Sequence, residues 1–278
     1  MEFNCGACGG NMFAVGDWLC RCGSCGYYRS NFKAGAGTGV SGLEQLRRAN
    51  FKVILDFIEK KKPLKGSRIL DIGCAQGWFL EEATLRGAIA HGIEPELANF
   101  EKCRAAGFSV ESGFFPEDLK KEGSFDLIFF NDVFEHIPNP ELICEALEHR
   151  LSEGGLLVIN LPNSSGIIFK IASILNKIGI RSPYERLWQK GFASPHISYF
   201  NEISIKKMIE NATALRQIFI FNLDTLNLAG LWHRVRASHK GIGGAFIYLF
   251  ILIFSFILPY CKPDIIVCGF EKNFKSSL

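Results

Sequence analysis

The stretch Ser-Arg-Ile-Leu-Asp-Ile-Gly-Cys-Ala-Gln-Gly, residues 67–77, decides the fold. Its first half is a short apolar run typical of a buried strand, and a helical pattern begins directly after it. Gly73 and Gly77 permit a tight turn and let a ligand approach the backbone closely at the helix N-terminus. The segment therefore predicts a strand, a ligand-binding turn and a helix in that order.

The next apolar run, residues 88–95, ends in Gly92-Ile93-Glu94-Pro95. Glu94 follows the glycine turn by about twenty residues, the spacing at which an acidic side chain closes the second strand of a nucleotide-binding βαβ unit. A carboxylate there can accept hydrogen bonds from both hydroxyls of a ribose. We therefore expect Glu94 to bind the ribose of a nucleotide.

Strand-like and helical segments alternate through the rest of the chain, which indicates βαβ units and a doubly wound parallel α/β sheet. An amphipathic helix over 43–62 precedes the first strand and ends before Pro63. A last helix (201–212) and a closing pair of strands (215–224 and 264–272) complete the pattern. The predicted strands and helices in between are 67–73, 77–87, 88–95, 96–107, 108–115, 124–132, 139–151 and 154–162.

Five of the ten cysteines lie between Cys5 and Cys25. The repeated Cys-Gly-x-Cys-Gly supplies four sulfur ligands, Cys5, Cys8, Cys22 and Cys25, which suit a structural zinc ion in a tetrahedral site. Cys20 is the expected non-ligand. Residues 1–30 are too few to bury a core, so metal binding would supply the folding free energy of this zinc-ribbon-like knuckle. Unligated thiols in a disordered tail and a redox pair are the alternatives.

The motifs Asp-Ile-Gly-Cys-Ala-Gln-Gly (71–77), Gly-Ile-Glu-Pro (92–95) and Gly-Phe-Phe-Pro-Glu-Asp (113–118) resemble those of the class I S-adenosylmethionine-dependent methyltransferases. The stretches 124–140 and 151–163 resemble the fourth-strand and fifth-strand motifs of the same family. The resemblance covers 43–222 and 264–272, and Ala75 replaces the middle glycine of the first motif. It implies a seven-stranded Rossmann-like sheet in the order 3-2-1-4-5-7-6, with the seventh strand antiparallel.

The same resemblance implies a set of residues that bind S-adenosyl-L-methionine. Asp71 and Gly73 would line its methionine end, Glu94 would hold the ribose, and Glu117 or Asp118 would lie near the adenine. The whole expected cofactor set is Asp71, Gly73, Cys74, Gly77, Glu94, Glu117, Asp118 and Asn131.

Methyl transfer needs an aligned nucleophile and, for many acceptors, a base that removes one proton. His136 and His196 are the candidate catalytic residues. The spacing of Asp132, Glu135 and His136 also resembles an acidic triad of ubiquinone-pathway O-methyltransferases, which implies a divalent metal such as magnesium. The alternatives are helix capping for the Glu-His pair and backbone hydrogen bonding for His196.

Two insertions interrupt the alternating pattern, at 163–200 and 225–262, within a methyltransferase domain predicted over 43–278. A Gly-rich linker is expected over 31–42. The second insertion contains residues 241–261, an uncharged apolar run preceded by Arg234, Arg236, His239 and Lys240. This composition favours attachment to an anionic membrane interface, and an apolar lid or a dimer interface is the alternative.

Three functions follow from these features. The first is a methyltransferase, peripheral or monotopic on the cytoplasmic face of a membrane, that O-methylates a lipid, a quinone or a lipid-linked glycan. The second is a ribosomal-RNA methyltransferase, which some zinc-knuckle proteins are, although a net charge of only +3 does not favour nucleic acid. The third is a cofactor-binding and zinc-binding scaffold without activity. The start of the chain shows no secretory signal, and nothing in the sequence indicates an oligomeric state.

Overall fold

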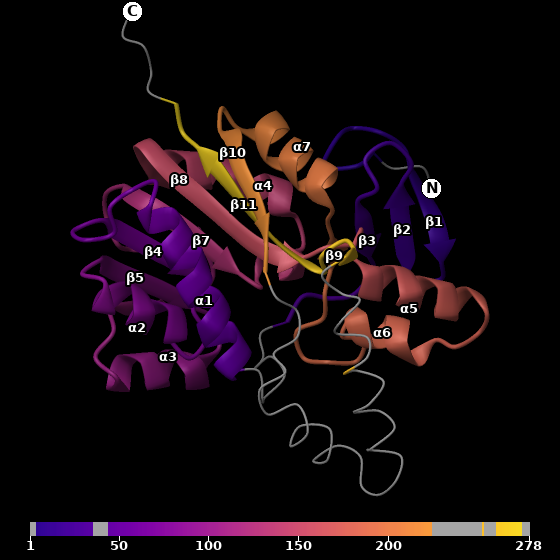
Figure 1. The fold of residues 1–278 in the computed structure, drawn as a ribbon, viewed down its shortest axis with the longest axis horizontal. Coiled ribbons are helices and arrows are strands. Elements are labelled where there is room, and N and C mark those ends of the chain that lie inside the picture. The colour runs from indigo at the N-terminus through magenta and orange to yellow at the C-terminus, as the bar shows by residue number, and fades with distance from the viewer. Residues whose placement is uncertain (1–3, 36–43, 224–251, 253–259, 274–278) are drawn as a thin grey trace, which may run out of the picture.

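The computed structural model describes residues 4–35, 44–223, 252 and 260–273. Its helices and strands agree in type and order with the alternating pattern, and the helix predicted over 43–62 spans Glu44–Glu59. The elements, drawn in Figure 1, are β1 Met12–Gly16, β2 Leu19–Cys22, β3 Tyr28–Ser30, α1 Glu44–Glu59, β4 Arg68–Ile72, α2 Trp78–Leu85, β5 Ile89–Glu94, α3 Leu97–Ala105, β6 Val110–Ser112, β7 Phe125–Asn131, η1 Phe134–His136, α4 Pro140–Arg150, β8 Leu151–Pro162, α5 Ile167–Lys177, α6 Ser182–Leu187, β9 Ser198–Tyr199, α7 Glu202–Ala212, β10 Arg216–Asn222 and β11 Ile265–Glu271.

The large sheet has seven strands in the order β10-β11-β8-β7-β4-β5-β6. Strands β4 to β8 run parallel, and β11 is antiparallel to both of its neighbours, β8 and β10. When the seven strands are numbered in chain order and read from β6, the order is 3-2-1-4-5-7-6. The predicted doubly wound sheet with an antiparallel last strand is therefore confirmed.

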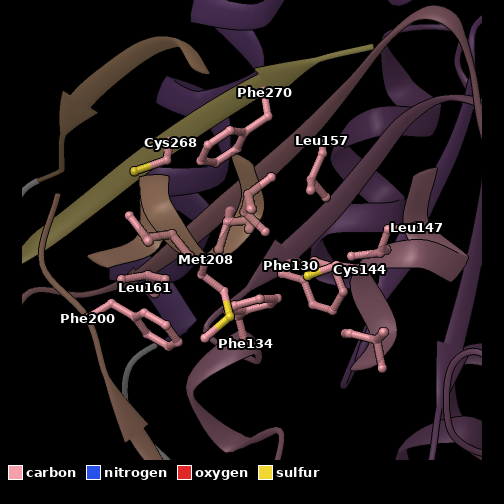
Figure 2. Close-up of a cluster of buried hydrophobic side chains, with 14 of the residues drawn as sticks. Phe130, Phe134, Cys144, Leu147, Leu157, Leu161, Phe200, Met208, Cys268 and Phe270 are labelled. Atoms are coloured by element: carbon pink, nitrogen blue, oxygen red, sulfur yellow. The ribbon is translucent and has the colours of Figure 1, made fainter. Parts of the chain in front are cut away.

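The large sheet buries both faces, because successive side chains of a strand point to opposite sides. On β7, Leu127 and Phe129 pack under α1 and α2, in one hydrophobic cluster. The intervening Ile128 and Phe130 belong to the cluster on the opposite face, where α4 and α7 cover the sheet. Figure 2 shows that second cluster, with Phe130, Phe134 and Met208 among its labelled members.

A second, smaller sheet contains β1, β2, β3 and β9, all antiparallel. Its first three strands come from the predicted zinc knuckle, and β9 comes from the first insertion. Cys5, Met12 and Tyr27 of the knuckle belong to the same buried cluster as Phe134 and Phe200. The knuckle and the large sheet therefore share one hydrophobic core.

The first insertion forms α5, α6 and β9, beside the small sheet (Figure 1). The second insertion, and with it the apolar run 241–261, lies outside the described residues except for Leu252 and residues 260–262. Within the part of the chain that the structure describes, every helix is too short or too polar to cross a bilayer. Membrane attachment through 241–261 stays a prediction, as do the boundaries of the 31–42 linker.

Candidate functional site

A cavity of about 590 Å³ opens where β4, β5 and β7 end. Gly73 follows β4, Glu94 ends β5 and Asn131 ends β7, and all three line the cavity. Open α/β sheets bind ligands at this edge, beyond the carboxyl ends of the strands. The volume is in the usual range of small-molecule sites.

The turn between β4 and α2 has a backbone that favours glycine. Gly73 has φ +71° and Gly77 has φ +79°, both in the left-handed region. A Cβ at Gly73 would lie 2.6 Å from Cγ2 of Val133, so a side chain there would clash with the loop after β7. Ala75 also has a positive φ, +47°, which costs an L-residue about 1 kcal/mol. The turn is held in a strained shape that leaves its backbone facing the cavity.

The carboxylate of Glu94 is fixed by two backbone amides. The N–H of Ala75 donates to Oε2 at 2.7 Å, and the N–H of Glu96 donates to Oε1 at 2.9 Å. Burial raises the pKa of Glu94, although both amides oppose this effect. Each oxygen keeps a further lone pair, so the group can still accept two hydroxyl donors from the cavity.

Asp71 lies beneath the turn and is fully buried. The side-chain amide of Asn131 donates to its Oδ1 at 3.0 Å, and burial raises the pKa of Asp71 to about 8. The protonated form of this carboxyl group is therefore favoured relative to that of a solvent-exposed aspartate. Oδ1 of Asn131 is buried without a partner among the described residues, and Asn131 itself lines the cavity.

Four of the other residues expected at the cofactor lie in different positions. Glu117 lines the cavity, whereas Asp118 accepts a hydrogen bond from the N–H of Phe114 at 2.8 Å and lies outside the lining. Cys74 packs into a small buried cluster behind the turn, and Gly77 begins α2. Cys74, Gly77 and Asp118 therefore shape the loops around the cavity without lining it.

His136 lies in the cavity wall with a defined tautomer. Its Nδ1 is 2.9 Å from the carbonyl oxygen of Pro195. A carbonyl only accepts, so Nδ1 carries the proton and Nε2 keeps a lone pair. Burial lowers the pKa of His136 below its ordinary value, which keeps the ring neutral at neutral pH.

His196 also lines the cavity. Its ring packs edge to face against the ring of His136, with the two ring centroids 4.7 Å apart. The side-chain amide nitrogen of Gln189 lies 2.9 Å from Nε2 of His196, so Nε2 accepts and Nδ1 carries the proton. Burial and the neighbouring His136 hold the pKa of His196 well below its ordinary value. The acceptor nitrogen of His196, Nε2, is thus already occupied by Gln189. Nε2 of His136 keeps its lone pair, because Pro195 contacts Nδ1.

Glu135, His136 and His196 bring one carboxylate oxygen and two ring nitrogens within 4.8 Å of one another. Asp132, the third member of the predicted metal triad, is not part of this group. Its carboxylate instead faces Nε of Arg47 at 3.6 Å. Burial and the charge of Asp132 raise the pKa of Glu135 well above its ordinary value.

A family model described as a methyltransferase domain matches residues 43–212, more than half of the chain. The chain belongs to the class I S-adenosylmethionine-dependent methyltransferases.

Relatives and solved structures agree with this assignment. A ubiquinone biosynthesis O-methyltransferase of Xylella fastidiosa is 33% identical over 129 residues, which are 44% of this chain and 52% of that protein. One from Chromobacterium violaceum is 32% identical over 129 residues, 43% of this chain and 55% of its own length. The methyltransferase therefore spans about half the length of the curated relatives it matches.

Among solved structures, an S-adenosylmethionine-dependent methyltransferase of Mesorhizobium loti matches with a TM-score of 0.55 and 13% identity, over 83% of this chain and 100% of that chain. A methyltransferase of Archaeoglobus fulgidus matches with a TM-score of 0.51 and 18% identity, over 83% and 97%. At this identity the structures support the fold alone.

The four predicted zinc ligands of the methyltransferase converge. Sγ of Cys5 is 3.7 Å from Sγ of Cys25, Sγ of Cys8 is 3.5 Å from Sγ of Cys22, and all four sulfurs lie within 4.8 Å of one another. A zinc ion with Zn–S bonds of about 2.3 Å needs sulfurs roughly 3.8 Å apart. The cluster therefore fits a tetrahedral zinc ion, and Cys20 lies outside it as predicted.

The knuckle directly supports the loop that carries His196. The N–H of Ser30 donates to the carbonyl oxygen of Ile197 at 2.8 Å, and its hydroxyl reaches the carbonyl of His196 at 3.1 Å. Tyr27 and Ser198 share a hydrogen bond of 2.6 Å between their hydroxyls. On the other side of the loop, the N–H of Ile197 donates to the carbonyl of Glu135 at 2.9 Å. Segment 195–198 is thus held between the knuckle and the turn that contains His136.

Sequence analysis missed Arg47, Gln189 and Pro195. Arg47 lies on an amphipathic helix where a basic residue has no distinctive pattern, and Gln189 lies in a loop with φ +49°. Pro195 contributes a backbone carbonyl, which any residue type would supply. Only the Ser-Pro-His run next to His196 could have pointed to this loop.

Proposed function

We propose that the methyltransferase O-methylates a hydroxyl group of an apolar, membrane-borne acceptor, which is a lipid, a quinone or a lipid-linked glycan. The observation that carries the proposal is that one cavity contains the Glu94 carboxylate, the Gly73 turn and the His136 ring. Binding of the methyl donor and removal of the acceptor proton can therefore occur in one place.

The residues around the turn fit the cofactor that the family uses. Glu94, already oriented by two backbone amides, would accept the ribose hydroxyls, and Glu117 would lie near the adenine. Asp71 and Asn131 would hold the methionine end, where a buried carboxyl and an unpartnered amide oxygen are available. When bound, S-adenosyl-L-methionine supplies an electrophilic methyl group.

His136 would serve as the general base. The Pro195 carbonyl fixes the ring proton on Nδ1, so Nε2 can take the proton of an acceptor hydroxyl. The lowered pKa keeps this nitrogen unprotonated at neutral pH. We assign His196 a positioning role, because Gln189 occupies its acceptor nitrogen and its ring packs against His136.

The four cysteines would hold a structural zinc ion. Four sulfur ligands close the coordination sphere, which leaves no position for a substrate. The contact between Cys25 and Cys5 lowers the pKa of the Cys5 thiol and raises that of Cys25, so one thiolate is favoured and zinc binding would displace the remaining protons. A divalent metal at Asp132, Glu135 and His136 is not needed by this mechanism.

The choice of an apolar acceptor rests on the cavity wall and the relatives. Leu46, Phe114, Ile137, Leu142 and Ile143 line the cavity. The curated relatives are named for ubiquinone biosynthesis, which involves an apolar acceptor. The predicted attachment through 241–261 would place the enzyme at the membrane that contains such acceptors.

No described contact favours ribosomal RNA as the acceptor. The knuckle residues that could bind RNA are Arg21, Tyr27, Tyr28, Arg29 and Lys33. Tyr27 is buried, Tyr28 packs against Phe169, and Arg29 donates to Asn139 at 2.7 Å, whereas Arg21 and Lys33 are exposed. The aromatic side chains that stacking would need are therefore occupied within the protein. A scaffold without activity is also not favoured, because the cofactor turn and the base share a cavity.

The direct test is methyl transfer from labelled S-adenosyl-L-methionine to a detergent-solubilised membrane lipid extract. We expect label in an organic-soluble product, and little label after replacing His136 with Asn. Label in ribosomal RNA, or no label in any fraction although the cofactor binds, would contradict the proposal.

A further inference from the structure

Helix α5 presents an apolar face to solvent. Ile171, Ile174 and Ile178 follow one another at helical spacing, and Ile180 lies just beyond the helix end. Their exposed fractions are 38%, 59%, 68% and 50%. Single exposed apolar residues are ordinary, but four exposed isoleucines within ten residues are a concentration of apolar surface typical of a binding surface.

The opposite face of α5 is firmly packed, which fixes the isoleucines in their outward orientation. Phe169 is buried against Tyr28, Tyr184 and Tyr199, with ring centroids 4.8–5.6 Å apart. At the start of the helix, Oδ1 of Asp264 accepts the N–H of Ile168 at 2.8 Å. The helix is therefore anchored at its first turn and along its inner side.

The same hairpin has a positive net charge that exceeds that of the whole chain. Residues 167–192 contain five basic side chains and one acidic side chain, a net charge of +4, whereas the whole chain carries +3. The acidic Glu185 is paired with Lys190 at 2.6 Å. Among the described residues, Lys170, Lys177 and Arg181 form no salt bridge. Lys170 and Lys177 lie seven residues apart, so they share one side of α5, next to the isoleucines.

We propose that the α5 surface, defined as Ile171, Ile174, Ile178 and Ile180 with Lys170, Lys177 and Arg181, docks on an anionic lipid bilayer. Aliphatic side chains bordered by lysine and arginine match the apolar and charged layers of such an interface. RNA would instead need exposed aromatic side chains for stacking, and the aromatic residues of this hairpin are mostly buried.

The hairpin that carries the docking surface continues into a loop that lines the cavity. Gln189 and Ser194, which follow α6 in the chain, both line the cavity. A bilayer beneath α5 would thus lie beside the loop that carries His196. This inference rests on the proposed function, because it names the surface through which a lipid acceptor reaches the site.

Sedimentation of the full chain with vesicles tests the docking surface. We expect binding to vesicles of phosphatidylglycerol mixed with phosphatidylcholine, and weaker binding to pure phosphatidylcholine. Replacing Ile174 and Ile178 together with Glu should lower the partition coefficient about tenfold or more. Replacing Lys170 and Lys177 with Glu should lower it about tenfold on anionic vesicles, and much less on neutral ones.

A matched control replaces Leu85 and Leu97 with Glu. Both are more than half exposed, and they lie on α2 and α3, away from α5 (Figure 1). This variant should bind vesicles within about twofold of the parent protein. Thermal unfolding and cofactor binding, measured on all variants, establish that each one is folded.

Three results would overturn the inference. The first is that the parent chain does not bind anionic vesicles, and the second is that the α5 variants bind them as well as the parent does. The third is that a structured RNA competes with the vesicles for the parent chain and no longer binds the lysine variant. Methyl transfer to a detergent-solubilised acceptor separates the two proposals. If the α5 variants keep this activity but the parent chain does not bind vesicles, the docking surface is wrong and the proposed function stands.

Discussion

Asp71, which lies beneath the Gly73 turn, has a buried carboxyl group whose ionisation affects stability. Its carboxyl group is fully buried and accepts one hydrogen bond from Asn131. Because its pKa is raised to about 8, the folded protein keeps this proton at pH values where the unfolded chain releases it. The folded state therefore binds more protons than the unfolded state between about pH 4 and pH 8. Stability should fall as the pH rises through this window.

We predict that Asp71→Asn reduces this loss of stability. In urea unfolding, the parent chain should lose roughly 3 to 4 kcal/mol more than the variant between pH 5 and pH 8. Cofactor binding, measured alongside, should weaken in the variant. Equal losses of stability in the two proteins would contradict the raised pKa.

The two histidines allow a second prediction at this scale. His136→Asn should lower kcat by about a hundredfold or more, because it removes the proton acceptor. His196→Asn should lower kcat less. In the parent enzyme the rate should be flat at neutral pH and fall only in acid below the ordinary histidine pKa, since burial lowers the pKa of His136.

The pH profile distinguishes a base from a structural residue. The decrease in kcat/KM at acidic pH should disappear in His136→Asn and persist in His196→Asn. Two results would assign the base to a different group. One is a larger decrease in kcat for His196→Asn than for His136→Asn, and the other is a decrease in kcat/KM at acidic pH that persists in His136→Asn.

Residues governed by local geometry were predictable from the sequence, and residues placed by tertiary contacts were not. Gly73 and Glu94 follow strands directly, so a strand, a turn and an acidic strand end were enough to place both at the cavity. Glu117 and Asp118 are adjacent, yet only Glu117 lines the cavity. The distinction depends on the hydrogen bond from Phe114 to Asp118, which no pattern indicates.

At the scale of elements, the knuckle acts on the site through the small sheet. Strand β3 pairs with β9, and the segment leading into β9 supplies the Pro195 carbonyl that orients His136. This pairing could not be predicted, because β9 has two residues and its partner is far away in the sequence. Most strands of the large sheet were predictable, since they have several apolar residues within a few positions. Strand β6, predicted within 108–115, spans only Val110–Ser112 and contains one apolar residue.

Removing the metal from the knuckle should therefore affect turnover more than cofactor binding. With a chelator, or with Cys8→Ser, we expect kcat to fall about tenfold or more while the Kd for S-adenosyl-L-methionine changes within about twofold. Amide hydrogen exchange at Ile197–Tyr199 should speed up, because the contacts of Ser30 are loosened.

Cys20→Ser is the matched control, since Cys20 lies in the same sheet but outside the sulfur cluster. It should leave turnover and exchange unchanged. Parallel loss of cofactor binding and turnover on chelation would mean that the knuckle supports the whole fold rather than one loop.

At the scale of the whole molecule, two sheets share one core around a single cavity. In our proposal, the large sheet supplies the turn that binds the cofactor on one side of this cavity, and the small sheet supports the loop that orients the proposed base on the other. Sequence patterns predicted the large sheet and the knuckle separately. Their union depends on Tyr27, Phe134 and Phe200, which are buried together although they are far apart in the chain.

The central claim is that the Gly73 turn and Glu94 bind the same nucleotide. Isothermal titration calorimetry of the metal-replete protein with S-adenosyl-L-homocysteine tests it most directly. We predict binding to one site, weakened about tenfold to a hundredfold in Glu94→Gln, because an amide has one acceptor oxygen where the carboxylate has two. The exposed Glu101→Gln should bind as the parent does. Absence of binding to the parent protein, or equal affinity in Glu94→Gln, would contradict the account.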